Sequence, residues 1–219
     1  MARYVRPIDA LLQERHLLRH PFYLAWSRGE LSVDTLRSYA GQYYHFESNF
    51  PRYVAAAYAR LHRASERRVL LENLVDEEGR DPTHPELWLD FAEGLGVGRR
   101  AAGSAPARTG TERLLATYDR LTRGSPASAV AALYSYESIF PEIAAEKSRG
   151  LRAMYGITDP KAHEFFRVHT GADVEHSRAE RAILERALRD APSERAVALA
   201  SARRAIDAWW GFLDGFPCA

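Results

Sequence analysis

The sequence contains one cysteine and two lysines in 219 residues. Because Cys218 is the single cysteine, the chain cannot form an internal disulfide. This residue stands next to the C-terminal residue. A terminal position is also unusual for a catalytic thiolate, which needs a positioned base beside it. Only Lys147 and Lys161 are lysines, and every other basic residue among the 30 is an arginine. Each lysine is therefore explained either by codon bias or by chemistry that arginine cannot perform.

The chain also lacks a strong net charge and a long apolar run. Thirty lysines and arginines stand against 29 acidic residues, a formal net charge of +1, which favours neither nucleic acid nor an anionic membrane as a partner. No stretch approaches the roughly 20 apolar residues of a membrane span, and the charged N-terminal segment does not resemble a secretory signal. We expect a cytoplasmic protein that acts on small molecules.

Helical periodicity covers almost the whole chain, and no alternating strand pattern, internal sequence repeat or dinucleotide glycine motif accompanies it. Two long helical patterns each contain a proline, Pro51 and Pro141, which we expect to kink the helix rather than end it. Residues 96–111, rich in glycine, alanine and arginine, form the one clear loop. The length suits one domain over residues 1–219, and the sequence predicts a single-domain, all-α bundle of seven to nine helices.

The segment FFRVHTGADVEHS, residues 165–177, carries three metal-binding side chains at spacings of four and three. At about 100° per residue, His169, Asp173 and His176 fall within roughly 60° of one another on one helical face. Imidazole and carboxylate are ligands of iron, manganese and zinc. A solvated face is the alternative, but the two phenylalanines that open the segment indicate an inward-facing stripe. Gly171 lowers helix propensity here, which suggests close packing or a close approach at this position.

Two further segments place carboxylates and a histidine in helical positions. Glu77 closes one expected helix and His84 opens the next, so the turn between them can bring both side chains to one point; a charged helix end is the simpler explanation. Glu137 stands in the most apolar part of its helix, where a carboxylate is costly to bury unless a cation meets it. An arginine could be that cation. Together, three carboxylates and three imidazoles suit two divalent metals with open positions for dioxygen.

These residues carry a resemblance to a known family. The Glu77/His84 pair, Glu137 in LYSYESIFPEIAAEK and H-x3-D-x2-H at 169–176 resemble the ligand set of the heme-oxygenase-like dimetal oxidases. The segment HPFYLAWSRGELSVDTLRSYAGQYYHFESNF is similar to the N-terminal helices of the wider TenA/PqqC-like superfamily. LYSYES…PEIAAEKSRGL and WWGFLDG are most similar to the branch of the chlamydial death-domain-associating protein (CADD). The resemblance implies a heme-oxygenase-like fold, without implying haem.

Proteins of this branch make para-aminobenzoate for folate synthesis, and each protein molecule is consumed in the reaction. A tyrosine side chain supplies the ring, and a lysine is implicated as the source of the amine. The matching positions are Tyr23 in HPFYLAW and Lys147 in AAEKSRG, and Tyr39 is a second tyrosine at a family-like position. A lysine can lose its proton in a buried site and act as a nucleophile, whereas arginine stays charged. Core packing for the tyrosines and surface charge for the lysine are the alternatives.

The resemblance also implies cofactors and partners. It implies two divalent metal ions, Fe/Fe or Fe/Mn, with dioxygen and a reductant as co-substrates, and it is compatible with a homodimer. The same metals would otherwise serve an external substrate such as a fatty acid or an amino acid. A haem oxygenase would need a proximal histidine near the N-terminus, where core packing or a helix end explains His16 and His20 better. A non-catalytic interaction module is suggested because the branch takes its name from binding death domains.

Overall fold

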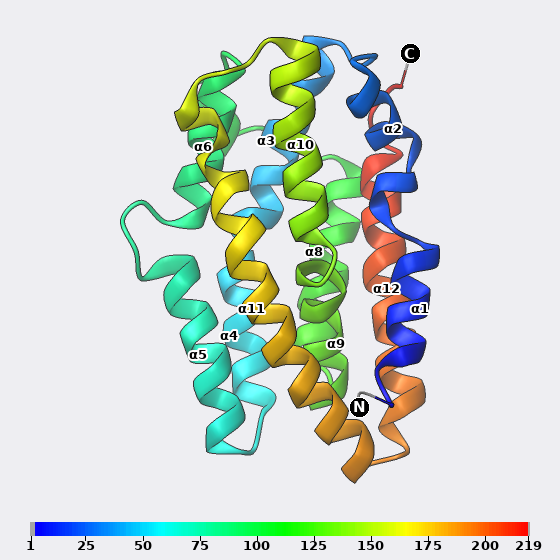
Figure 1. The fold of residues 1–219 in the computed structure, drawn as a ribbon. Coiled ribbons are helices and arrows are strands. Elements are labelled where there is room, and N and C mark those ends of the chain that lie inside the picture. The colour runs from blue at the N-terminus through cyan, green and yellow to red at the C-terminus, as the bar shows by residue number, and fades with distance from the viewer. Residues whose placement is uncertain (1–2, 219) are drawn as a thin grey trace.

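The computed structural model describes residues 3–218 as a bundle of helices (Figure 1). These residues form twelve α-helices and one short 3-10 helix, and they contain no strand. None of the described helices is long and apolar enough to cross a membrane. The helices are α1 (Arg6–Glu14), η1 (Leu17–Arg19), α2 (Pro21–Arg28), α3 (Val33–Glu47), α4 (Phe50–Arg60), α5 (Ala64–Glu78), α6 (His84–Gly94), α7 (Arg99–Gly103), α8 (Thr109–Thr122), α9 (Pro126–Glu137), α10 (Phe140–Tyr155), α11 (Pro160–Asp190) and α12 (Glu194–Leu213).

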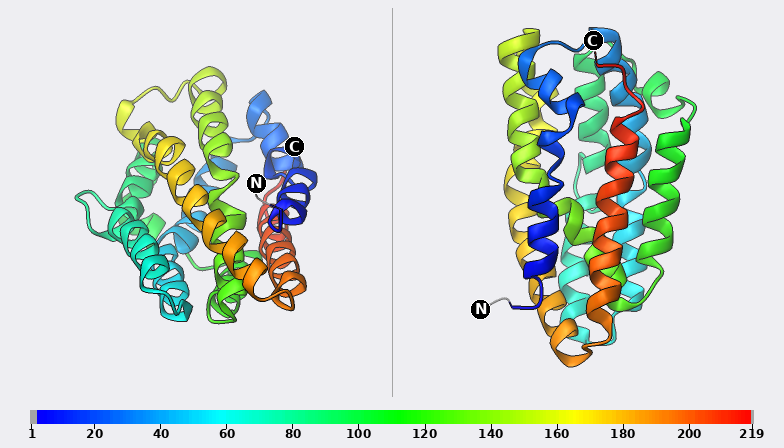
Figure 2. Two further views of the ribbon diagram at one scale, coloured as in Figure 1. Left: turned by 60° about the horizontal axis from the view of Figure 1, so that its bottom comes forward. Right: turned by 90° about the vertical axis from the view of Figure 1, so that its right-hand side faces the viewer.

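The most apolar helix lies at the centre of the bundle. Every residue of α9 from Ala127 to Glu137 is buried, as expected of a helix that is hydrophobic on all sides. α9 packs against both α11 and α12 (Figure 1), and α1 runs along the outside of α12 (Figure 2). One hydrophobic cluster connects these helices, and the all-α prediction is confirmed.

The helices outnumber the seven to nine expected because two long helical patterns break. Residues 48–49 separate α3 from α4, and residues 138–139 separate α9 from α10. Pro51 and Pro141 each take the second position of the new helix, where a missing N–H removes no intrahelical hydrogen bond. The predicted kinks are therefore helix ends. The loop predicted over 96–111 contains the five-residue helix α7, and its last three residues belong to α8.

Two glycines allow close approach between helices that carry site residues. A Cβ built on Gly150 of α10 would lie 2.6 Å from Cδ1 of Trp26 in α2. A Cβ on Gly94 of α6 would likewise overlap the Cβ of Ala162 in α11. Since real Cβ atoms do not approach so closely, both positions require glycine. They set the spacing between α10 and α2 and between α6 and α11.

His16 caps the start of η1, and His20 caps the start of α2. Nδ1 of His16 accepts a hydrogen bond from the backbone N–H of Leu18, and Nδ1 of His20 accepts one from Phe22. Each satisfies an amide at a helix start that has no intrahelical acceptor. The helix-end explanation of these two histidines is therefore confirmed.

Candidate metal centre

The helical regions singled out in the sequence meet inside the bundle. All six predicted ligands are buried, and the most exposed of them retains only 9% of its surface. They come from four helices, as expected for a metal site in the core of a helical bundle. They are Glu77 of α5, His84 of α6, Glu137 of α9, and His169, Asp173 and His176 of α11.

The turn between α5 and α6 brings Glu77 and His84 together, as predicted. Gly79 forms the C-cap of α5, and a capping box of Thr83 and Glu86 starts α6. Nδ1 of His84 consequently lies 2.9 Å from Oε2 of Glu77. The local chemistry of two helix ends therefore fixes this pair of side chains.

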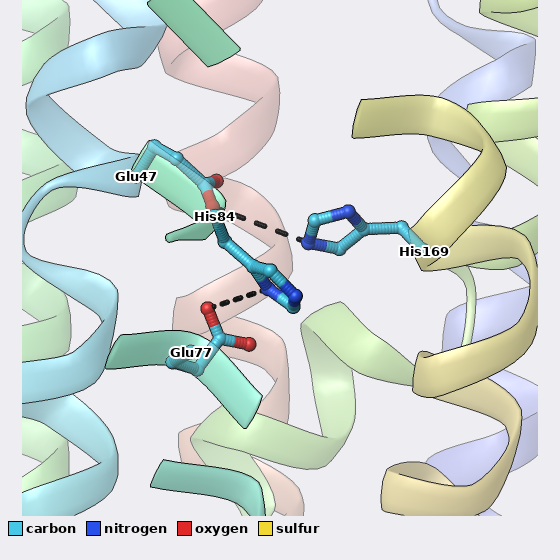
Figure 3. A group of neighbouring side chains, drawn as sticks. All are labelled: Glu47, Glu77, His84 and His169. Carbon is cyan, nitrogen blue, oxygen red and sulfur yellow. Dashed lines mark hydrogen bonds and ion pairs between the residues drawn. The ribbon is translucent and has the colours of Figure 1, made fainter. Parts of the chain in front are cut away.

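The potential ligand atoms form two groups that share one carboxylate. Within each group, one ligand atom from every residue lies within 4.8 Å of the others. Four side chains from α3, α5, α6 and α11 point toward one another in the first group (Figure 3). A shared carboxylate is what a bridging position between two metals requires. The first group is Glu47, Glu77, His84 and His169, and the second is Glu77, Glu137 and His176.

His169 is oriented by its own helix. Its Nδ1 lies 2.7 Å from the carbonyl oxygen of Phe165, one turn earlier, so Nδ1 carries the proton and donates it. Nε2 is left with a free electron pair and lies 4.0 Å from Oε1 of Glu47 (Figure 3). Burial lowers the pKa of His169 well below its usual range, and His84 lowers it further. A neutral ring with one fixed N–H is the form that binds metals.

His176 lies between two carboxylates. Its Nε2 is 3.0 Å from Oδ2 of Asp76, and its Nδ1 is 3.5 Å from Oε1 of Glu137. Burial disfavours the charged ring, but Glu137 and Asp76 outweigh burial and raise the pKa of His176 to about 9. Asp76 therefore orients the ring through the nitrogen that faces away from Glu137. Carboxylates commonly hold metal-binding histidines in this way.

Several buried oxygen atoms of the site lack a hydrogen-bond partner among residues 3–218. They are Oε1 of Glu47, Oε2 of Glu137 and Oδ2 of Asp173. Asp173 belongs to neither group, yet burial and the neighbouring Glu137 raise its pKa well above the usual range. Divalent cations would offset both the missing donors and the clustered negative charge. The residues thus fit the metal ions that a carboxylate–imidazole set indicates.

Lys147 lies in an aromatic chamber next to the first group. Its side chain is fully buried, and Nζ has no hydrogen-bond partner within the described part of the chain. Burial lowers the pKa of the Lys147 amine well below its usual range, and Glu47 is the charge that opposes this. Nζ lies 4.3–5.8 Å from the centres of six rings, those of Tyr23, Tyr39, Tyr43, Trp88, Phe140 and Phe166.

Four tyrosine hydroxyls in this core form two hydrogen-bonded pairs. The hydroxyls of Tyr23 and Tyr39 lie 3.0 Å apart, and those of Tyr43 and Tyr136 lie 2.6 Å apart. Burial raises the pKa of each of these phenols, so all four are protonated. The structure therefore brings the predicted catalytic residues Tyr23, Tyr39 and Lys147 together.

A cavity of about 650 Å³ between α5 and α11 reaches the potential ligands from solvent. His84 and His176 line it, whereas neither Tyr23 nor Lys147 is among its described lining residues. Gly171 also lines it, and a Cβ there would meet no described atom within 4 Å. The close-packing alternative at Gly171 is therefore wrong, because this glycine faces open space.

Glu47 was missed in the sequence, although a short repeat points to it. The pattern Glu-Ser-x-Phe-Pro occurs at residues 47–51 and again at 137–141, which contradicts the expectation of no internal repeat. In both copies the glutamate is the last residue of its helix. The expectation failed because the two copies share only four identical residues within five positions.

Comparisons with known proteins identify the family. A family model described as an iron-containing redox enzyme matches residues 37–210. The chain belongs to this family. A 4-aminobenzoate synthase of Nitrosomonas europaea is 42% identical over 97% of this chain and 90% of its own. One from Chlamydia trachomatis is 38% identical over 97% and 91%. The crystal structure of a CADD-like protein of unknown function from Nostoc punctiforme matches with a TM-score of 0.79 at 21% identity, covering 96% of this chain and 94% of that chain.

Membership in the iron-containing redox enzyme family confirms three expectations. The heme-oxygenase-like fold, the similarity to the CADD branch and the assignment to an oxidoreductase class all agree with these matches. The buried glutamate and histidine groups provide a place for iron.

Proposed function

We propose that the protein is a 4-aminobenzoate synthase that builds its product from its own Tyr23 and Lys147. The observation that carries this proposal is the position of Lys147, whose amine is fully buried, unpartnered among the described residues and 5.7 Å from the centre of the Tyr23 ring. Burying an amine without a partner is costly, which argues for a chemical role. The relatives from N. europaea and C. trachomatis, both called 4-aminobenzoate synthases, support the same product.

Two divalent ions, Fe/Fe or Fe/Mn, complete the proposed site. When bound, iron supplies oxidising chemistry that draws on dioxygen and external electrons. Glu77 would take part in holding both ions, because both groups contain it. The proposed ligands are the six that the sequence predicts: Glu77, His84, Glu137, His169, Asp173 and His176.

The proposed roles of the other residues follow from their surroundings. Tyr39 holds the Tyr23 hydroxyl at 3.0 Å and thereby fixes the ring that is consumed. Lys147 presents a neutral, nucleophilic amine because burial lowers its pKa. The surrounding rings exclude water, which would otherwise compete with the amine for an oxidised ring.

The intact mass of the protein tests this proposal. Purified chain is loaded with Fe(II) without oxygen, reduced and then exposed to oxygen, and its mass is measured before and after. We expect a loss localised to Tyr23 by peptide mapping, with at most one 4-aminobenzoate per chain. Tyr23→Phe and Lys147→Arg should bind iron and yield no product. Product at the parental rate from either variant would contradict the proposed roles.

The cavity beside His84 and His176 favours a second candidate, an oxidase with an external substrate. A small molecule entering there would meet the ligands without passing Tyr23 or Lys147. Oxygen uptake over many turnovers, with no change in protein mass, would support this candidate.

The buried polar site gives the interaction-module alternative no support. A cytoplasmic location, a homodimer and a single domain over residues 1–219 stay predictions.

A further inference from the structure

Glu47 has features that its place in the sequence does not explain. It is 1% exposed, and its Oε1 has no hydrogen-bond partner among the described residues. A lone carboxylate in such surroundings is expensive to keep ionised. Lys147 is the basic side chain that acts on Glu47, yet no ion pair joins the two side chains within 4.0 Å in the described structure. Lys147 therefore does not satisfy this carboxylate.

The geometry of Glu47 suits a metal ligand. Its Oε1 lies 4.0 Å from Nε2 of His169, the nitrogen whose lone pair is free. Metal–ligand bonds of roughly 2.0–2.2 Å separate two ligand atoms on one ion by roughly 3 to 4.4 Å. The carboxylate of Glu77 and the imidazole of His84 complete the same group (Figure 3).

The internal repeat gives independent support. Glu47 and Glu137 occupy the same position of the Glu-Ser-x-Phe-Pro repeat, at the ends of α3 and α9. Each belongs to one of the two groups, Glu47 to the first and Glu137 to the second. The two copies of the repeat thus supply one terminal carboxylate to each side of the shared Glu77.

We propose that Glu47 is a seventh protein ligand, which binds the ion held by Glu77, His84 and His169 as Glu137 binds the other ion. This inference rests on the two-metal part of the proposed function. It requires neither the consumption of Tyr23 nor the transfer of an amine.

Anaerobic titration of the full-length apoprotein with Fe(II) tests the role of Glu47. The number of bound ions is counted by metal analysis, and their affinities are measured by calorimetry. We expect the parent to bind two ions per chain and Glu47→Gln to lose one of them or to bind it at least tenfold more weakly. Two ions bound within twofold of the parental affinities would overturn the assignment.

Matched variants separate ligation from folding. Glu66→Gln removes another buried carboxylate, from α5 and outside both groups, and should bind both ions as the parent does. Glu47→Asp keeps the charge but shortens the side chain, so it should weaken the same ion, and unchanged binding would contradict the proposal. A parent that binds no iron would overturn the proposed function as well. A parent that binds two ions, with a Glu47→Gln variant that binds them equally well, would overturn only this inference.

Discussion

The hydroxyl groups of Tyr23 and Tyr39 lie 3.0 Å apart in the core between α2 and α3. Tyr39→Phe would keep the ring and remove one partner of this hydrogen bond. We expect a loss of about 1 kcal/mol in the free energy of unfolding, measured by urea denaturation. The yield of 4-aminobenzoate per chain should fall without vanishing, because the Tyr23 ring remains. A yield of zero, as expected for Tyr23→Phe, would instead give both tyrosines indispensable roles.

Asp76 should control metal affinity without binding the metal itself. Asp76→Asn weakens the hydrogen bond that orients His176, and we expect the affinity for Fe(II) to fall about 10- to 100-fold. Asp76 also forms an exposed ion pair with Arg80. Arg80→Gln is therefore the control, and its affinity should stay near the parental value. Equal losses in both variants would assign the effect to the surface ion pair.

Two glycine substitutions should have opposite effects on stability. Gly150→Ala places a methyl group 2.6 Å from Trp26, and we expect a loss of roughly 1–3 kcal/mol from overpacking. Gly171→Ala enters open space within a helix, so it should stabilise the protein by up to about 1 kcal/mol. Thermal unfolding of the two apoproteins measures both changes. Similar losses would mean that Gly171 is packed in solution.

Glu185 should make stability depend on pH. Burial opposes its ionisation, but hydrogen bonds from the backbone N–H groups of Tyr4, Arg3 and Val5 outweigh burial and lower its pKa. The pKa of Glu185 is therefore lower in the folded protein than in the unfolded chain. Its ionised form stabilises the fold above a pH of about 4.3, and this contribution is lost as the pH falls through the folded pKa.

Glu185→Gln provides the measurement of that contribution. At pH 7 we expect the variant to be less stable than the parent by at most about 1 kcal/mol, since the site is only partly buried. The difference should shrink on titration toward pH 3. A difference that is constant between pH 7 and pH 3 would show that packing, not charge, links this residue to the N-terminal segment.

The sequence predicts best the parts of the site whose residues lie close together along the chain. His169, Asp173 and His176 share a face of α11, and periodicity alone reveals such a stripe. The Glu77–His84 pair spans a turn whose caps are also encoded locally. These features depend on neighbouring residues and need no knowledge of packing.

Glu47 could not be found in the same way, because its significance arises from packing between helices. α3 brings it to α6 and α11 only in the folded bundle. Its sequence signal is the short repeat that it shares with Glu137, not a ligand pattern in its own helix. The prediction of close packing at Gly171 was wrong for another reason, since a helical glycine can indicate either close approach or open space. Pro51 likewise permits a kink or a new helix, and local sequence does not decide between them.

Tyr23 and Lys147 are parts of the polypeptide itself, and this limits how much product a cell can make. Both side chains belong to the core of the chain and are fixed there by α2 and α10. In the proposed reaction, neither can be replaced from solution once it has been used. Output would then follow the rate of translation, with one newly synthesised chain used for each molecule of product. The rate of protein synthesis would thus limit the supply of this metabolite.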